Sequence, residues 1–207
     1  TMMVGRQISQ MYERPERQAG EVALETKDLT GLRFRNVNIR VRCGEIVGIG
    51  GLVGAGRTEL VKAIFGYDRI ESGKVFVHGR EMKRHSPRNS VEAGIGFLPE
   101  DRKSEGLIQQ QPIKNNILQA SMKRYFKRGL VDKKAEKELA ERYRGELKIA
   151  TPDVTRRVSA LSGGNQQKVV IAKWLCTENR ILIFDEPTRG IDVGAKTEIY
   201  ALIGRLA

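Results

Sequence analysis

The chain has 207 residues, of which 40% are hydrophobic, so it can bury one core and is too apolar to be a disordered chain. No stretch approaches the roughly 20 apolar residues that a membrane-spanning helix needs. Its 37 lysines and arginines against 25 acidic residues give a net charge of +12, the usual footprint of a nucleic-acid binder.

The basic excess is regional, since residues 101–157 hold 15 basic and 8 acidic residues, a net of +7. Lys123–Arg128 mixes basic and aromatic residues, but so short a cluster is more typical of a solvated helix end. Nucleic-acid binding is therefore kept as an alternative. The first residues lack an apolar leader, and Cys43 and Cys176 are the only cysteines, so we expect no export and a reducing cytoplasm.

The first third of the chain predicts a linker followed by strands. Residues 1–20 are polar and lack periodicity, which indicates a linker or the tail of a preceding domain. Residues 34–42 alternate apolar and polar side chains, which predicts a half-buried strand. The short apolar run Ile46–Ile49 precedes a glycine-rich turn and predicts a fully buried strand.

The remaining pattern alternates strands with helices. Strands are predicted at Lys74–His78, Ile95–Leu98 and Ile181–Phe184, and helices at Thr58–Phe65, Ile113–Met122, Asp132–Lys148 and Val193–Leu206. Such alternation favours an α/β core, and the helical middle predicts an inserted subdomain. We expect the core to span 21–100 and 159–207 and the helical subdomain to span 101–158.

The glycine-rich turn Gly51–Thr58 matches the phosphate-loop template G-x-x-x-x-G-K-[ST] except at Arg57, where lysine is usual. Its backbone N–H groups and the dipole of the following helix favour phosphate, and Thr58 is placed to ligate Mg²⁺. Because guanidinium is larger and planar, we expect ATP binding to survive here while hydrolysis suffers. A plain tight turn is the alternative for this motif alone. The residues expected to bind ATP are Gly51, Gly54, Ala55, Gly56, Arg57, Thr58 and Glu59.

A buried strand ending in two carboxylates follows much later, at Arg180–Glu186. Asp185 is expected to hold Mg²⁺ through water, and Glu186 to orient or deprotonate the attacking water. An Asp-Glu pair alone usually caps a helix, but the apolar run before this pair and the Pro-Thr after it argue against that reading.

The most specific string is Leu161–Lys168, which reads L-S-G-G-N-Q-Q-K. Ser162 is suited to cap the next helix, and two glycines leave its first turn bare for an anion. An ordinary serine-capped helix would not explain two glycines that weaken it. The residues expected to clamp a γ-phosphate are Leu161, Ser162, Gly163, Gly164, Asn165 and Gln166.

This string resembles the signature of ABC ATPases. Gly51–Thr58 resembles their Walker A motif, Leu182–Glu186 their Walker B motif, and Gly190–Asp192 lies where they have the D-loop, with Asp192 as its acid. The resemblance implies an ABC-type P-loop NTPase fold that hydrolyses ATP with Mg²⁺.

More narrowly, several strings look like the C-terminal half of ATPases that serve ribose, galactose, arabinose and xylose importers, which carry two ATPase domains in one chain. They are Met3–Arg6, Gly51–Leu60, Pro99–Gly106, Ser162–Lys168 and Asp185–Lys196. The resemblance implies that residues 1–20 end the first domain, and we expect the core to continue past Ala207.

In this family ATP lies between two domains, with Walker A of one facing the signature of the other. The chain departs at Arg57 and at Glu100, which stands at the Q-loop glutamine and is expected to contact ATP. The resemblance thus implies that this signature completes a site on the first domain, while the chain's own phosphate loop is weaker. The isolated fragment is expected to be weakly active or inactive.

The expected partners are the first ATPase domain of the full-length chain, membrane permease subunits that contact Glu100–Ile108 and, indirectly, a periplasmic or lipoprotein sugar-binding protein. No nucleic acid is expected, and the protein is placed peripherally on the cytoplasmic face of the membrane. The alternatives are an importer of nucleosides or another small polar solute, and a soluble ABC ATPase acting on nucleic acid or ribosomes.

Overall fold

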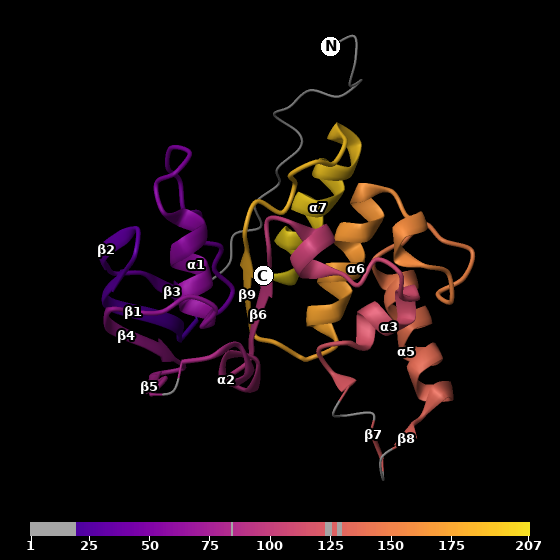
Figure 1. Ribbon diagram of the computed structural model, residues 1–207, viewed down its shortest axis with the longest axis horizontal. Coiled ribbons are helices and arrows are strands. Elements are labelled where there is room, and N and C mark those ends of the chain that lie inside the picture. Colours follow the sequence, from indigo (N-terminus) through magenta and orange to yellow (C-terminus); the bar gives the residue numbers. More distant parts are fainter. Residues whose placement is uncertain (1–19, 84, 123–125, 128–129) are drawn as a thin grey trace. The chain divides into compact units, whose positions relative to one another are not determined.

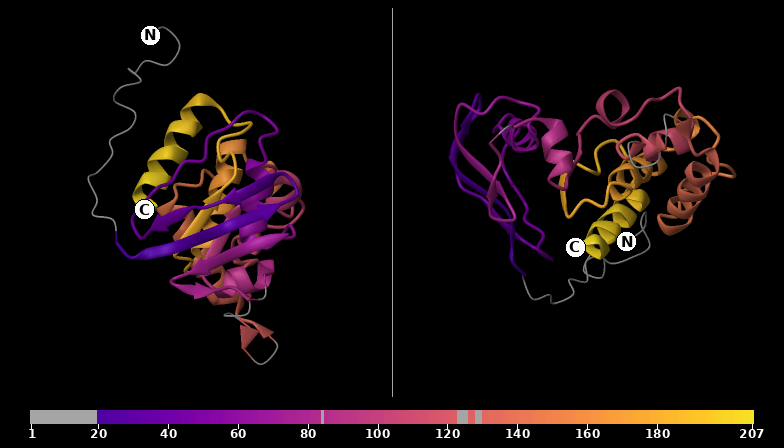
Figure 2. Two further views of the ribbon diagram at one scale, coloured as in Figure 1. Left: turned by 90° about the vertical axis from the view of Figure 1, so that its left-hand side faces the viewer. Right: turned by 90° about the horizontal axis from the view of Figure 1, so that it is seen from below.

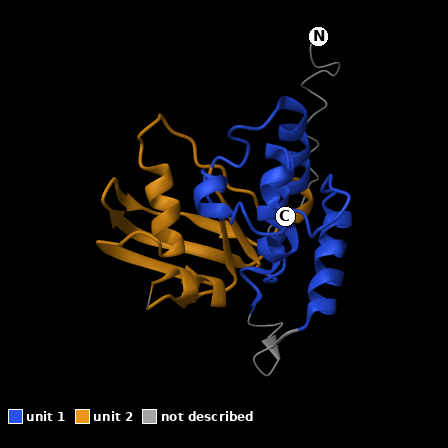
Figure 3. Cartoon of the chain, turned by 45° about the vertical axis from the view of Figure 1, so that its right-hand side comes forward, with its two compact units in different colours: residues 1–12, 98–178, 186–203 blue, residues 13–97, 179–185, 204–207 orange. Residues whose placement is uncertain are grey.

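The computed structural model describes residues 20–83, 85–122, 126–127 and 130–207. Residues 1–19 of the predicted linker, and most of the basic cluster Lys123–Arg128, lie outside the described residues. The chain forms two compact units, coloured separately in Figure 3. Among described residues, unit 2 holds 20–97, 179–185 and 204–207, and unit 1 holds 98–178 and 186–203.

Unit 2 is built on an antiparallel sheet around its longest strand, β1. This strand pairs with three others, and the last of these pairs with β5. The strands are β1 (Val22–Gly31), β2 (Phe34–Val37), β3 (Arg40–Arg42), β4 (Ser72–Val77) and β5 (Arg80–Glu81). The alternating strand predicted at 34–42 is therefore present as two pieces, both paired with β1, and the strand predicted at Lys74–His78 is confirmed as β4.

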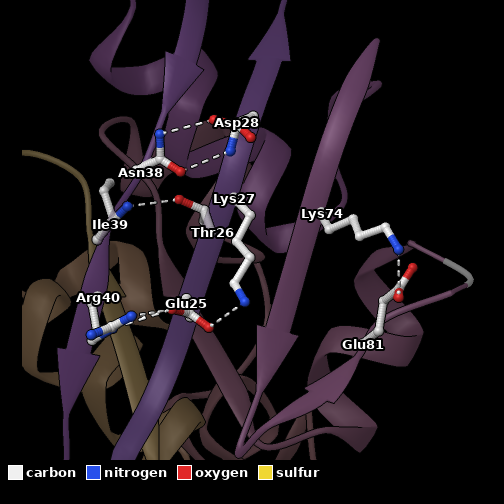
Figure 4. Close-up of polar contacts among 9 residues, drawn as sticks. All are labelled: Glu25, Thr26, Lys27, Asp28, Asn38, Ile39, Arg40, Lys74 and Glu81. Atoms are coloured by element: carbon white, nitrogen blue, oxygen red, sulfur yellow. Dashed lines mark hydrogen bonds and ion pairs between the residues drawn. The ribbon is translucent and has the colours of Figure 1, made fainter.

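The side chain of a buried threonine in β1 hydrogen-bonds the backbone where β2 ends and before β3 begins. Thr26 Oγ1 donates to the carbonyl of Val37 (3.0 Å) and accepts from the N–H of Ile39 (2.9 Å). On the same strand, the N–H of Asp28 donates to Asn38 Oδ1 at 2.9 Å (Figure 4). These bonds satisfy backbone groups that the interrupted ladder leaves without strand partners.

A second, two-stranded sheet pairs β6 (Ile95–Leu98) with β9 (Ile181–Phe184), and both strands have the predicted bounds. The buried strand predicted at Ile46–Ile49 is wrong. This segment forms no strand with any described residue, and Ile46, Val47 and Ile49 are 61%, 40% and 39% exposed. An apolar run becomes a strand only where a partner takes up its backbone hydrogen bonds.

Helix α1 (Arg57–Phe65) confirms the helix predicted at Thr58–Phe65 and starts one residue earlier. Its second half is buried, and the ring of Phe65 stacks on that of Phe97 in β6, with 5.3 Å between ring centroids. The short helix α2 (Pro87–Glu92) is capped by Ser86, whose side chain accepts from the N–H of Asn89. Figure 1 shows α1 beside the β1–β4 sheet within unit 2.

Unit 1 is mainly helical, and α3 packs against both α5 and α6. Its elements are the π-helical turn η2 (Arg102–Gly106), α3 (Ile113–Leu118), the hairpin β7 (Phe126–Lys127) and β8 (Leu130–Val131), α5 (Lys133–Glu146), the 3₁₀ turn η3 (Val158–Ala160), α6 (Gly163–Leu175) and α7 (Val193–Leu206). The last two residues of α7, Arg205 and Leu206, and Gly204 before them group with unit 2. The predicted limits of a helical subdomain, 101–158, stay a prediction.

Two buried polar side chains in unit 1, those of Asn116 and Ser121, hydrogen-bond the nearby backbone. Asn116 is 1% exposed; its Oδ1 accepts from the N–H of Ile108, and its Nδ2 donates to the carbonyls of Ile108 and Pro112. Helix α3 ends at Leu118, four residues before the predicted Met122, because the N–H and hydroxyl of Ser121 both bond the Leu118 carbonyl.

The predicted helices Asp132–Lys148 and Val193–Leu206 are confirmed as α5, which is shorter at both ends, and α7 (Figure 2). Within the described part of the chain, no helix is both long and apolar enough to cross a membrane.

Candidate functional site

The phosphate loop ends at a glycine whose backbone conformation other residues adopt only at a cost. Gly56 has φ 83°, and a Cβ built on it would lie 2.4 Å from the carbonyl oxygen of Arg33. Gly56 is also the N-cap of α1, and as a glycine it provides no side-chain cap for the helix. Gly51 and Ala55 are exposed, as is Gly54, which has φ 82°. This loop can bind an anion through its backbone.

The arginine that replaces the usual lysine folds back along the loop. Arg57 Cδ and Cγ lie 3.5 and 3.7 Å from the position of a Cβ on Gly51, so the arginine stem passes close to the start of the loop. Glu59, one of the predicted ATP ligands, forms an ion pair with Arg33 in which Nε and Oε1 are 3.6 Å apart. Its role at the nucleotide stays a prediction.

The two residues predicted to hold Mg²⁺ lie together in unit 2. Thr58 Oγ1 donates to Asp185 Oδ1 at 3.3 Å, although 127 residues separate them. Asp185 is 6% exposed at the end of β9, and Thr58 lies in the first turn of α1. A hydroxyl and a carboxylate are hard oxygen ligands, and Mg²⁺ commonly takes one or two such groups together with phosphate oxygens and water. The residues therefore fit this ion.

Two further glutamates of the predicted site, Glu100 and Glu186, lie in unit 1. Glu186 is exposed and has φ 43°, a left-handed conformation that costs a non-glycine residue roughly 1 kcal/mol. Such strain is found where a site must aim a side chain. Glu100 forms an ion pair with Arg189, a contact that the sequence analysis did not foresee.

The signature string begins α6, and Ser162 lies at the predicted cap position. The capping hydrogen bond from its side chain, however, is not formed. Ser162 occupies the N-cap position without a side-chain bond to the helix backbone, and its Oγ accepts instead from Asn165 Nδ2 at 2.9 Å. Asn165 Oδ1 in turn accepts from the N–H of Ala150 at 2.8 Å. The asparagine thus takes the hydroxyl that would otherwise cap the helix, so the serine does not cap the first N–H groups.

Both signature glycines are also required by close packing. A Cβ on Gly163 would lie 2.7 Å from Arg102 Nη2, and one on Gly164 would lie 2.7 Å from the Cβ of Ala195 in α7. Leu161 precedes the helix, and Gln166 is buried and donates to the carbonyl of Val158 at 3.3 Å. The first turn of α6 is therefore held from two sides within unit 1.

The D-loop acid caps the last helix. Asp192 precedes α7, and its Oδ1 accepts from the N–H of Ala195 at 2.8 Å. Sequence reasoning missed the neighbouring cations. Arg102 is buried among these loops, and the buried Lys168 donates to the carbonyl of Lys148 and pairs with Glu198. A single sequence gives little signal for either, because charged residues are usually exposed.

The sequence of this chain is similar to those of known ATP-binding proteins. A family model described as ABC transporter matches residues 34–189. Over all of this chain, a ribose import ATP-binding protein of Rubrobacter xylanophilus is 52% identical. A putative ribose/galactose/methyl galactoside import ATP-binding protein of Burkholderia lata is 50% identical over the whole chain as well. The chain spans about 41% of the length of each of these relatives.

Solved structures share the fold at low sequence identity. An ATP-binding cassette in a post-hydrolysis state bound to ADP and Pi matches with TM-score 0.73 and 22% identity, covering 87% of this chain and 81% of that one. A nucleotide-free ATP-binding cassette from an ABC transporter matches with TM-score 0.75 and 21% identity, covering 89% and 77%. The predicted fold class, an α/β P-loop NTPase of the ABC type, is confirmed.

Proposed function

The chain belongs to the ABC transporter family, and from that premise we propose that it is the second nucleotide-binding domain of a tandem ATPase that drives monosaccharide uptake. The observation that carries this proposal is the pairing of Thr58 with Asp185 beside the phosphate loop. The ribose and galactose import functions named for relatives about 50% identical support the substrate class.

ATP would bind with its phosphates on the N–H groups of the loop that ends at Gly56 and on the start of α1. Thr58 and Asp185 would hold Mg²⁺, which supplies charge neutralisation for the phosphates. Glu186 would orient the attacking water and accept its proton. Arg57 always carries its charge but is bulkier than lysine and lies along Gly51, which favours binding over hydrolysis.

The other half of the domain would serve a different nucleotide. The bare first turn of α6, with Ser162 and the two glycines, presents backbone N–H groups suited to the γ-phosphate held by the first domain of the same full-length chain. We therefore assign the signature to the more competent site and the Arg57 loop to the weaker one. The domain would lie on the cytoplasmic side of the membrane and bind permease subunits there. A sugar-binding protein would act on the domain only indirectly.

The full-length ATPase reconstituted with its permease in proteoliposomes tests the proposal through ATP-driven uptake of labelled ribose or galactose. Ser162→Arg should abolish uptake, whereas Arg57→Ala should only reduce it. Ser159→Arg, an exposed serine three residues earlier, is the matched control and should transport as the wild type does. Loss of uptake in Arg57→Ala with normal uptake in Ser162→Arg would show the asymmetry to be reversed.

The isolated domain gives a second test. It should bind ATP with Mg²⁺ but turn it over slowly, because each site needs a partner domain. Brisk hydrolysis by the monomer would contradict the division into two half-sites.

A further inference from the structure

A buried arginine in unit 1 joins two segments that lie far apart in the sequence. Arg102 starts the π-helical turn η2 and is 8% exposed. Its Nη1 donates to the carbonyl of Arg189 at 2.7 Å, and its Nη2 donates to the carbonyl of Gly190 at 3.2 Å. The planar guanidinium thus binds two successive carbonyls, the second of which lies two residues before Asp192.

Burying the charged guanidinium of Arg102 to hold this loop costs free energy. Burial lowers the pKa of Arg102, with Asp101 acting in the opposite direction, and within the described residues the guanidinium forms no ion pair with a carboxylate. Its Nε is buried and has no hydrogen-bond partner among the residues that the structure describes. A buried cation held by carbonyls alone is poor evidence for stabilisation, which favours a role in geometry.

The same guanidinium touches the start of the signature helix. A Cβ on Gly163 would lie 2.7 Å from Arg102 Nη2 and 3.1 Å from the carbonyl oxygen of Gly190. Gly190 has φ 65°, and its own Cβ position is 3.8 Å from the guanidinium. Arg102, Gly163 and Gly190 therefore meet at one point, and a side chain at Gly163 would displace the guanidinium.

A second link comes from the same short segment. Glu100, two residues before Arg102, forms an ion pair with Arg189. Two residues of the segment Glu100–Arg102 thus bind Arg189. Glu100 pairs with its side chain, and Arg102 donates to its backbone carbonyl. A displacement of this segment would reach both the start of α6 and the loop before α7.

We propose that Arg102 is a positioning residue that fixes the loop before Asp192 against the first turn of α6, so that both meet the nucleotide of the partner domain together. This inference rests on the proposed function, because it assumes that these elements act on that nucleotide. In this role Arg102 acts on the nucleotide only through Gly163 and Gly190.

The test uses the full-length ATPase with its permease and compares Arg102→Ala, Arg102→Lys and the wild type. Arg142→Ala is the matched control, because it removes an exposed arginine of unit 1 that pairs with Glu146 on α5. For each variant the steady-state kcat and KM for ATP, the melting temperature and backbone hydrogen exchange are measured.

Arg102→Ala is expected to lower kcat about tenfold or more, the effect of a small displacement of a positioned group, while KM changes less than about twofold. Exchange should quicken in the peptide covering residues 186–194 and stay unchanged in 133–146. Arg102→Lys should recover part of kcat, since an ammonium can donate to one carbonyl but lacks the rigid fork.

A kcat for Arg102→Ala equal to that of Arg142→Ala overturns the inference, and so does a fall in melting temperature with parallel losses in kcat and ATP affinity. Full recovery in Arg102→Lys overturns the need for the planar fork. These failures differ from failure of the proposed function, which would appear as a wild-type protein without ATP-driven sugar uptake.

Discussion

The hydroxyl of Thr58 donates a 3.3 Å hydrogen bond to the carboxylate of Asp185, so the first turn of α1 and the end of β9 meet at one point in unit 2. The two residues supply the oxygen ligands that Mg²⁺ prefers, and the phosphate loop ends immediately before Thr58. We therefore expect nucleotide binding at this point to depend on Mg²⁺, which leads to the first prediction.

Thr58→Ala and Asp185→Asn should each weaken Mg²⁺-dependent ATP binding by about tenfold or more, because each changes a group proposed to hold the ion. Binding of ATP in excess EDTA should change far less, since the backbone of the loop remains. Titration of a fluorescent ATP analogue with and without Mg²⁺ measures both quantities. Thr155→Ala, an exposed threonine of unit 1, is the control, and equal losses with and without Mg²⁺ would contradict the assignment.

The phosphate loop should tolerate no side chain at Gly56. Gly56→Ala should lower the free energy of unfolding by about 2 kcal/mol or more, because its φ is positive and the new Cβ would meet the carbonyl of Arg33. Gly48→Ala is the matched control, since apart from its chain neighbours no described atom lies within 4 Å of its Cβ position. Urea denaturation compares the two, and similar stabilities would disprove the close contact.

Strands and helices were predictable where the pattern itself determines the element. The apolar runs Ile95–Leu98 and Ile181–Phe184 are strands with the expected limits, and α7 starts and ends as expected. Ile46–Ile49 is a similar apolar run but pairs with no strand among the described residues, which composition cannot show. Strand β1 was missed because its mixed sequence has no clean alternation, although it is central to the sheet.

For the site, spacing identified the residues but not their contacts. The phosphate-loop and acidic-strand motifs led to Thr58 and Asp185, which the structure brings together. Nothing in the sequence distinguishes the buried Arg102 from the exposed Lys103 beside it. That difference depends on which carbonyls the fold places within reach, which is a property of tertiary packing.

Helix α5 offers a stabilising substitution. Gly145 lies near its C-terminus, and beyond its chain neighbours and the nearby helix backbone no described atom lies within 4 Å of its Cβ position. Gly145→Ala should therefore raise the free energy of unfolding by about 0.5–1 kcal/mol, because alanine loses less backbone entropy on folding. Thermal and urea denaturation measure the change. A loss of stability would mean that the end of α5 needs the freedom of glycine.

Lys173 should make stability depend on pH. It is 6% exposed on α6, its Nζ donates to the carbonyl of Gly106 at 2.7 Å, and burial lowers its pKa from 10.5 to about 8. Between these two values the unfolded chain holds a proton that the folded protein has released. The free-energy cost of burying the charged ammonium is therefore fully present below pH 8. Above pH 8 the contribution of Lys173 to the free energy of unfolding rises with pH.

The difference in unfolding free energy between the wild type and Lys173→Met should accordingly rise by on the order of 3 kcal/mol between pH 8 and 10.5. Burial also raises the pKa values of Tyr143 and Cys176 to about 12, which makes stability fall at high pH, but this effect is common to both proteins and cancels in the difference. Urea denaturation across this range measures it. Lys133→Met, an exposed lysine of α5, should show no such rise, and a flat difference for Lys173→Met would mean that the buried ammonium keeps its proton.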